Sequence, residues 1–247
     1  MAPPSAVPQP SLRAPGAGAE LLLIRHGRSA DVVPGSPESL DPPLHVEGVA
    51  QAAALAARLA SKRIDAIYTS HLARAVQTAQ PLAEARGLTI ESIEDLEEVR
   101  LGDWAAGEFR RRAMVSDPEW LAWRRTRRWD GIPGGEGDLV FRTRVTAAVD
   151  AIARRHPDGT TAIVVHGGVI QAYLAQVLEI PHTLWLTVEN TSVTKVLVGD
   201  GEHEVVVAGD CHHLYDPVLG PPAPTTADAT SVEAVPAAGP VPDGATR

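Results

Sequence analysis

The sequence predicts an α/β protein in which a mostly parallel sheet lies between two layers of helices. Aliphatic runs at residues 21–24, 66–68 and 162–165 are too short for helices and carry the branched residues typical of buried strands. Longer amphipathic segments, with apolar residues three and four positions apart, follow these runs. Strands that alternate with helices form a sheet whose strands are mainly parallel and whose faces are covered by helices. We therefore expect a single-domain three-layer sandwich.

The remaining elements follow from composition and turn residues. Segments rich in alanine and leucine favour helix, and helices are expected at residues 46–61, 72–85, 138–155 and 168–178. Two further strands, at 193–198 and 204–208, flank Gly199-Asp200-Gly201, which suits a hairpin turn at the edge of the sheet.

Length and composition fit one domain with a tail at each end. A chain of 247 residues, 44% of them hydrophobic, is long enough to bury one sizeable core. Residues 1–18 and 217–247 are rich in Pro and Ala and poor in large apolar residues, so both are expected to be disordered. The folded domain is then expected at residues 19–216.

Composition also limits location and partners. Cys211 is the only cysteine, which excludes an internal disulfide and multi-cysteine metal sites and indicates a cytoplasmic protein. We expect no membrane partner, because the chain has no signal peptide and no apolar run of membrane-spanning length. The net charge of -9 argues against nucleic acid, although a local arginine cluster still binds a small anion. A monomer and a homo-oligomer both remain open.

Two of the predicted strands end in a His-Gly pair. Residues 21–24 lead into Arg25-His26-Gly27, and residues 162–165 lead into His166-Gly167-Gly168. Ligands of such sheets bind at the carboxyl ends of the strands, so the two imidazoles are expected to face one shared site. A glycine after each histidine lets the backbone turn sharply and leaves room for a ligand.

Arg74 is expected at the same edge of the sheet, because it follows the strand at 66–68 by about one helical turn. Taken alone, Arg74 fits a solvated position on a helix surface as well as a place in the site. Each histidine, taken alone, fits a structural role at a strand end as well as a functional one. Together they predict a cationic site for a phosphate.

These residues resemble the histidine phosphatase superfamily, which includes phosphoglycerate mutases and many phosphatases. The similarity lies in four blocks in the same order: 25–27, 70–79, 96–104 and 165–168. Weaker similarities lie at 44–52, 133–136 and 190–192. The triplet alone is unspecific, whereas four ordered blocks make a chance match improbable. The resemblance covers about residues 20–214 and implies a phosphoglycerate mutase-like fold.

The resemblance also implies a role for each site residue. His26 is the expected nucleophile, because a neutral imidazole attacks phosphorus without bringing in a second negative charge. Arg25 and Arg74 are expected to bind the nonbridging oxygens, with His166 as a further catalytic donor and the backbone N–H of Gly167 beside them. No metal and no cofactor are expected.

Glu98 is the expected general acid and base, because it stands four residues before Gly102 as the family pattern requires. The alternative is that Glu98 is an exposed glutamate of the acidic run at residues 94–98, and the family pattern favours Glu98 over Glu97 as the acid.

Three positions depart from the family pattern. Arg28 stands where Glu or Gln is commoner, Val32 stands where mutases carry a phosphate-contacting Asn, and residues 104–107 are looser than the usual Trp-Glu-Gly. These departures leave the substrate open and keep the catalytic set intact.

Two other clusters have a functional and a structural interpretation each. A helix at 119–128 carries Arg124, Arg125, Arg127 and Arg128, which either bind a second anionic group of the substrate or form a solvated face behind inward-packed tryptophans. Asp210-Cys211-His212-His213 has residue types that suit zinc, but consecutive residues of an extended segment point to opposite faces, so a structural role is favoured.

The predicted function is metal-independent hydrolysis of a small phosphomonoester through a phosphohistidine intermediate. The first alternative is a mutase that returns the phosphoryl group to another hydroxyl. It is disfavoured by Val32 and by the short segment between Trp104 and Pro133, since a mutase has to exclude water from phosphohistidine. The second alternative is a non-catalytic protein that binds a phosphorylated ligand.

Overall fold

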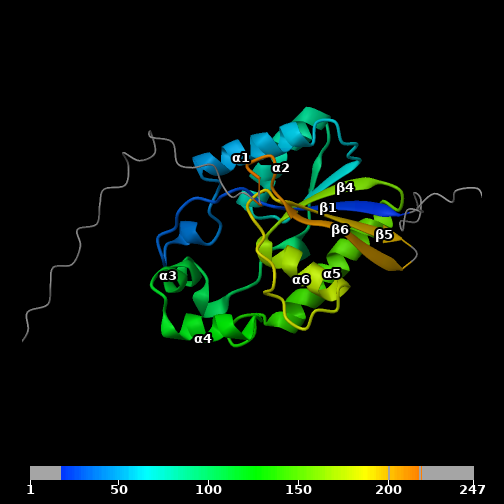
Figure 1. Cartoon of the computed structure of the whole chain (residues 1–247). Coiled ribbons are helices and arrows are strands. Elements are labelled where there is room, and N and C mark those ends of the chain that lie inside the picture. The colour runs from blue at the N-terminus through cyan, green and yellow to red at the C-terminus, as the bar shows by residue number, and fades with distance from the viewer. Residues whose placement is uncertain (1–17, 200, 217, 219–247) are drawn as a thin grey trace, which may run out of the picture.

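A computed structural model describes residues 18–199, 201–216 and 218 (Figure 1). Its centre is a six-stranded sheet in the order β3-β2-β4-β1-β5-β6. Neighbours among β3, β2, β4 and β1 are parallel, whereas β5 is antiparallel to both β1 and β6. The strands are β1 (Ala19–Arg25), β2 (Ala66–Thr69), β3 (Ile90–Ser92), β4 (Thr160–Val165), β5 (Val193–Gly199) and β6 (Glu202–Asp210).

Helices cover both faces of the sheet, which confirms the predicted α/β sandwich. In Figure 1, α1 and α2 lie on one side of the sheet and α5 and α6 on the other. The helices are α1 (Val46–Arg58), α2 (Ala73–Arg86), α3 (Glu108–Met114), α4 (Pro118–Thr126), α5 (Asp138–Arg155) and α6 (Gly167–Val177). Short 3-10 turns span Pro37–Ser39, Glu94–Leu96 and Gly102–Trp104.

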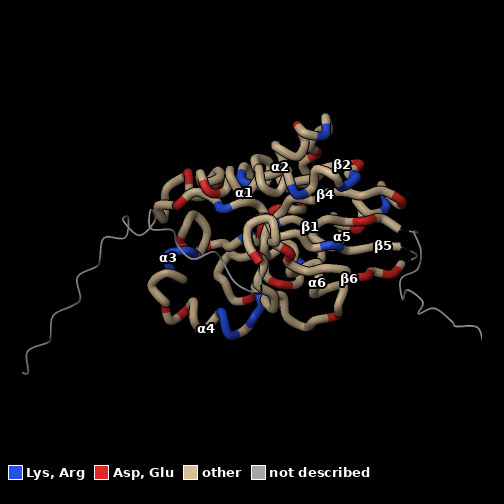
Figure 2. Tube along the Cα trace, turned by 45° about the horizontal axis from the view of Figure 1, so that its top comes forward, with Lys and Arg blue, Asp and Glu red and all other residues tan. Residues whose placement is uncertain are grey.

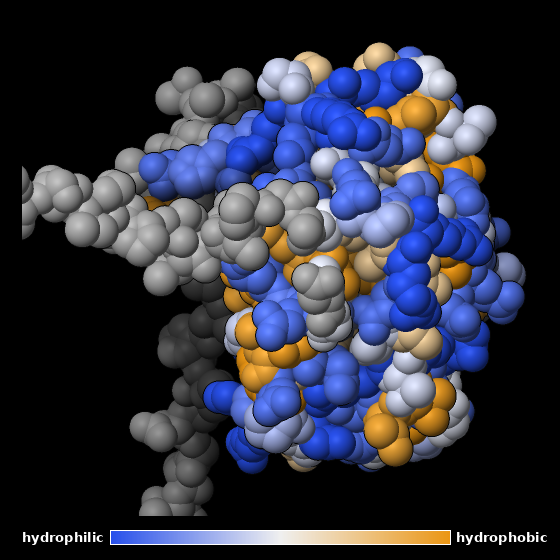
Figure 3. Space-filling model, turned by 90° about the vertical axis from the view of Figure 1, so that its right-hand side faces the viewer, coloured by the Kyte–Doolittle hydropathy of each residue, from blue (hydrophilic) through white to orange (hydrophobic). Residues whose placement is uncertain are grey.

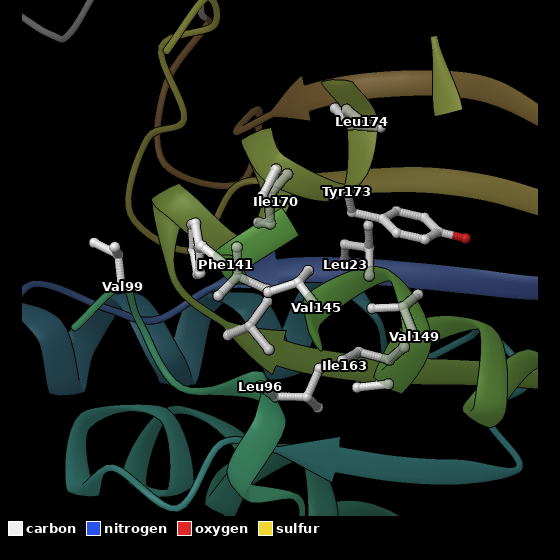
Figure 4. Close-up of a cluster of buried hydrophobic side chains, with 14 of the residues drawn as sticks. Leu23, Leu96, Val99, Phe141, Val145, Val149, Ile163, Ile170, Tyr173 and Leu174 are labelled. Atoms are coloured by element: carbon white, nitrogen blue, oxygen red, sulfur yellow. The ribbon is translucent and has the colours of Figure 1, made fainter. Parts of the chain in front are cut away.

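Alternating side chains of β1 divide the core into two parts. Leu22 and Ile24 pack with buried residues of α1 and α2, whereas Leu23 packs with α5 and α6. Figure 4 shows the second part, where Leu23 and Ile163 of the sheet lie against labelled side chains of both helices. Burial on both faces explains why the aliphatic runs identify these strands in the sequence.

Two elements escape the sequence analysis for the same reason. Strand β3 has only three residues, of which Glu91 and Ser92 are exposed, and α3 has no buried residue. Neither offers an apolar pattern to detect.

Helices α3 and α4 form a small cap that aromatic rings hold together. The Phe109 ring packs edge-on against Trp123 with 5.3 Å between centroids, and Trp123 lies 5.2 Å from Trp129. Isolated helices of 7 and 9 residues are marginal in water, so this cluster is what stabilises them.

The described part of the molecule is consistent with the predicted domain. The predicted tails lie outside the described residues, except for Gly18 and Val218, and the domain boundaries stay a prediction. Among the described residues, no helix is both long and apolar enough to cross a lipid bilayer. The surface away from α3 and α4 is mainly hydrophilic, with separate apolar patches (Figure 3).

Candidate active site

A cleft of about 820 Å³ lies beside the carboxyl ends of the central strands, under the cap. Its walls include Arg25 and His26 from the end of β1, Arg74 from α2 and Glu98 from the loop before Gly102. His166, at the end of β4, is not part of the cleft wall, because its side chain is fully buried behind His26.

The two histidines meet as the sequence predicts. Strands β1 and β4 are parallel neighbours with Arg25 opposite Val165, so the residues that follow them are adjacent. The ring centroids of His26 and His166 are 5.1 Å apart, and the ring planes are inclined at 59°.

His26 is held in one tautomer by its own backbone. Its Nδ1 lies 2.7 Å from the carbonyl oxygen of Gly27, which only accepts, so Nδ1 carries the proton and Nε2 has a free lone pair. Burial, together with the guanidinium groups of Arg74 and Arg25, holds the pKa of His26 well below its ordinary value of 6.5. A neutral imidazole with a free nitrogen is a nucleophile.

The backbone at His26 is fixed from three directions. The N–H of His26 donates to Val165 of β4 at 2.8 Å, and the side-chain amide of Asn190 donates to the His26 carbonyl at 2.8 Å. The N–H of Thr191 donates to the Arg25 carbonyl at 2.9 Å. The weak similarity at 190–192 thus marks residues that position the strand end.

Arg25 and Arg74 flank the two rings. Arg25 Nη1 donates to the carbonyl of Val188 at 2.6 Å, but its Nε is buried without an acceptor among the described residues. Arg74 lies 3.5 Å from Asp41, whose carboxylate also accepts the N–H of Ala73 at the start of α2. Asp41 therefore positions Arg74, a relation that the sequence alone does not reveal.

Glu98 lies beside the start of α6. Its carboxylate accepts the N–H of Gly168 at 3.1 Å and that of Val99 at 3.0 Å, and it interacts favourably with the charges of Arg25 and Arg74. Glu97 instead pairs with Arg100. The two neighbouring glutamates therefore have different surroundings, and Glu98 is the one bound to the helix that follows His166.

Gly27, the glycine after His26, is required for packing against α1 and not for ligand access as expected. A Cβ at Gly27 would lie 2.7 Å from the carbonyl oxygen of Gly48, so Gly27 is needed where the loop packs on α1. The expectation that it makes room for a ligand is wrong. At Gly168, by contrast, a Cβ would lie 2.2 Å from a carboxylate oxygen of Glu98, so this glycine does leave space for a site residue.

Arg110 is a cleft residue that the sequence analysis misses. It lies on α3, lines the cleft, and donates to the hydroxyl of Ser29 at 2.8 Å and the carbonyl of Ala30 at 3.0 Å. Its charge acts on Arg25, His26 and Arg74. Arg28 lines the cleft too but pairs with Asp31 and Glu47.

The four arginines predicted as a second anion site lie elsewhere, since none of them lines the cleft. Arg128 pairs with Asp130 and Asp138. The other three border a separate hollow of about 710 Å³, which lies between α4 and residues 184–187: Arg124, Arg125 and Arg127. Figure 2 shows them as the basic stretch at the end of α4, and Trp123 points inward, as the solvated-face alternative predicts.

The segment 210–213 has ordinary structural contacts. His212 pairs with Asp210 at 3.0 Å, His213 contacts the hydroxyl of Thr191 at 2.9 Å, and Cys211 is buried. Within the described ranges, no three His, Cys, Asp or Glu side chains are grouped as a metal site requires.

Comparison with known proteins places the chain among phosphatases. The sequence model of the histidine phosphatase superfamily (branch 1) matches residues 21–210. Glucosyl-3-phosphoglycerate phosphatase of Mycobacterium tuberculosis is 33% identical over 176 residues, which are 67% of this chain and 78% of that protein. Phosphoserine phosphatase 1 of Hydrogenobacter thermophilus is 32% identical over 154 residues, 60% of this chain and 70% of that protein. The crystal structure of phosphoglycerate mutase from Bacillus anthracis is 25% identical with a TM-score of 0.64, covering 80% of this chain and 96% of that one.

Proposed function

The chain belongs to the histidine phosphatase superfamily, and on that premise we propose that it hydrolyses a small phosphomonoester through a phosphohistidine formed on His26. The predicted class of activity, phosphatase, is confirmed, because relatives that share about a third of their aligned residues with this chain are phosphatases. The intermediate, the residue roles and the substrate are our proposal.

The observation that carries the proposal is that two of the buried polar atoms without a partner belong to the side chains around His26. Arg25 Nε and His166 Nδ1 have no hydrogen-bond partner within the described structure; the His166 ring lies 5.1 Å from that of His26, and the charge of Arg25 acts on His26. A buried donor without an acceptor costs about 1–3 kcal/mol, so such groups are tolerated where a ligand supplies the acceptor. Phosphoryl oxygens are that acceptor in our proposal.

In the first step, the Nε2 lone pair of His26 attacks phosphorus and the bond from phosphorus to the leaving oxygen breaks. Glu98 gives its proton to that oxygen, and the alcohol departs. The Nδ1 proton of His26 stays on the ring, where the carbonyl of Gly27 stabilises the charge that the phosphorylated imidazole acquires. Arg25, Arg74 and the N–H of Gly167, the first residue of α6, hold the phosphoryl oxygens.

In the second step, Glu98 takes a proton from water and the water oxygen attacks phosphorus. The bond from phosphorus to Nε2 breaks, which releases inorganic phosphate and returns His26 to its starting state. The guanidinium groups and N–H donors supply the charge stabilisation that phosphoryl transfer needs, so no metal is assigned a part.

The test compares Glu98→Gln with its neighbour Glu97→Gln on two esters. Glu98→Gln should slow hydrolysis of an alkyl phosphate by about 10²–10⁴-fold and of p-nitrophenyl phosphate far less, because nitrophenolate leaves without a proton. Glu97→Gln should change neither rate by more than about twofold. Equal losses on both esters, or a larger loss with Glu97→Gln, would contradict the role of Glu98.

Product analysis separates hydrolysis from the mutase alternative. With 3-phosphoglycerate, we expect release of inorganic phosphate, unchanged by EDTA; formation of 2-phosphoglycerate without release would contradict the proposal. We also propose a cytoplasmic location and no nucleic-acid partner, supported by the single cysteine and by the net charge of -9.

A further inference from the structure

Ser70 is fully buried at the end of β2 and belongs to neither the cleft wall nor the catalytic set. Its hydroxyl oxygen lies 2.8 Å from Nε2 of His166. The backbone N–H of Leu72 donates to the same oxygen at 3.4 Å. A serine hydroxyl has one proton to give, and His166 is the acceptor that the structure offers for it.

This arrangement determines the state of His166. If the hydroxyl of Ser70 donates to Nε2, the ring proton of a neutral His166 has to sit on Nδ1. The ring is indeed neutral around pH 7, since burial, together with the guanidinium groups of Arg74 and Arg25, holds its pKa well below 6.5. Nδ1 is buried without an acceptor among the described residues, and the ring lies 5.1 Å from that of His26.

We propose that Ser70 is a positioning residue that fixes His166 in the Nδ1–H tautomer, so that this N–H is available to a phosphoryl oxygen. This inference rests on the proposed function in one respect: the function identifies the group that accepts the Nδ1–H hydrogen bond as a phosphoryl oxygen. The opposite tautomer would give the phosphate a lone pair instead of a donor, which repels an anion. Because Nδ1 is enclosed in the free protein, the side chains around it have to shift when a phosphoryl group enters.

The first measurement needs no catalysis and no variant. Nitrogen NMR of the full chain with ¹⁵N-labelled histidine at pH 7.5 should show His166 protonated on Nδ1, and orthovanadate should shift that signal. His166 protonated on Nε2 would overturn the proposal even in a fully active enzyme. An inactive wild type with the Nδ1–H tautomer would instead contradict the proposed function and leave the role of Ser70 standing.

The second measurement compares two serine variants and a threonine control by kcat/KM and by vanadate inhibition. Ser70→Ala should lower kcat/KM about tenfold or more, the size of effect seen for outer partners of functional histidines, and should remove the Nδ1–H signature. Ser70→Thr keeps a hydroxyl and should restore both. Thr161→Val is the matched control, because Thr161 is also fully buried and its hydroxyl has no partner among the described residues, but it lies near the start of β4, away from His166.

Thermal melting of each variant shows whether a loss of activity comes from unfolding of the protein or from a change at His166 in a folded protein. A folded Ser70→Ala protein that keeps wild-type kcat/KM and the Nδ1–H tautomer would overturn the proposal, as would an equal loss in Thr161→Val.

Discussion

The ends of β1 and β4 are two versions of one sequence pattern. Each is a buried aliphatic strand followed by histidine and glycine, and the two lie side by side in the sheet. Yet His26 is protonated on Nδ1 through Gly27 and keeps Nε2 free, whereas the Nε2 of His166 is occupied by Ser70 and its Nδ1 has no acceptor in the described structure. In our proposal, one imidazole attacks phosphorus and the other donates a hydrogen bond.

The difference comes from neighbours that are distant in the sequence. His26 reaches the cleft wall, while His166 is covered completely. Gly27 is pressed against the backbone of Gly48, while Gly167 opens α6 beside the Arg25 side chain. Similar local sequences therefore acquire different roles through tertiary contacts, and the following predictions test that division.

The largest effect is expected from His26→Ala. Loss of the nucleophile should lower phosphate release by more than about a thousandfold. After reaction with ³²P-labelled substrate, quenching with SDS at alkaline pH, where phosphohistidine is stable, should trap label on the wild type and none on this variant. His203→Ala, which alters a partly exposed histidine on β6, should retain both activity and label.

His166→Ala should cost less, about 10²–10³-fold in kcat, because it removes one donor and leaves the nucleophile in place. The decisive measurement is again the alkaline SDS quench: label should still accumulate on His26. If His166→Ala abolished labelling as completely as His26→Ala, the two histidines would not be divided as attacker and donor.

Two glycine variants should separate stability from catalysis. Gly27→Ala forces a Cβ against the backbone of Gly48 and should lower the free energy of unfolding by about 1–3 kcal/mol, measured in urea. Gly168→Ala meets the side-chain end of Glu98 rather than backbone, so it should unfold close to wild type while losing about tenfold in hydrolysis of alkyl phosphates. The reverse pattern would show that our assignment of the two glycines is wrong.

The smallest effect is a dependence of stability on pH. Both imidazoles have pKa values below 6.5 when folded, so below pH 6.5 the unfolded chain binds more protons than the folded one. The free energy of unfolding should therefore fall as the pH drops from 6.5, by up to about 1.4 kcal/mol per pH unit for each histidine. His166→Gln should reduce that slope in urea titrations at pH 7.5 and 5.5. An unchanged slope would mean that His166 is not buried in the neutral form.

By itself, the sequence determined the strands, the main helices and which of the predicted site residues meet. Its aliphatic runs report burial on two faces, and residues that end parallel strands must meet at one edge, so the approach of His26, His166 and Arg74 is predicted without a structure. Glu98 required the family pattern as well, because an acidic run gives no reason to prefer one carboxylate.

Only the tertiary structure decided the contacts of short or charged segments. Arg110 lies on a seven-residue helix without a buried residue, and Asp41 acts through Arg74 from a loop, so neither produces a periodic pattern. The His26 tautomer depends on a hydrogen bond to the adjacent Gly27, whereas the contact of His166 is with Ser70, a residue far away in the sequence. Ser70 and His166 follow different strands, so they come within hydrogen-bond distance only when the sheet has formed.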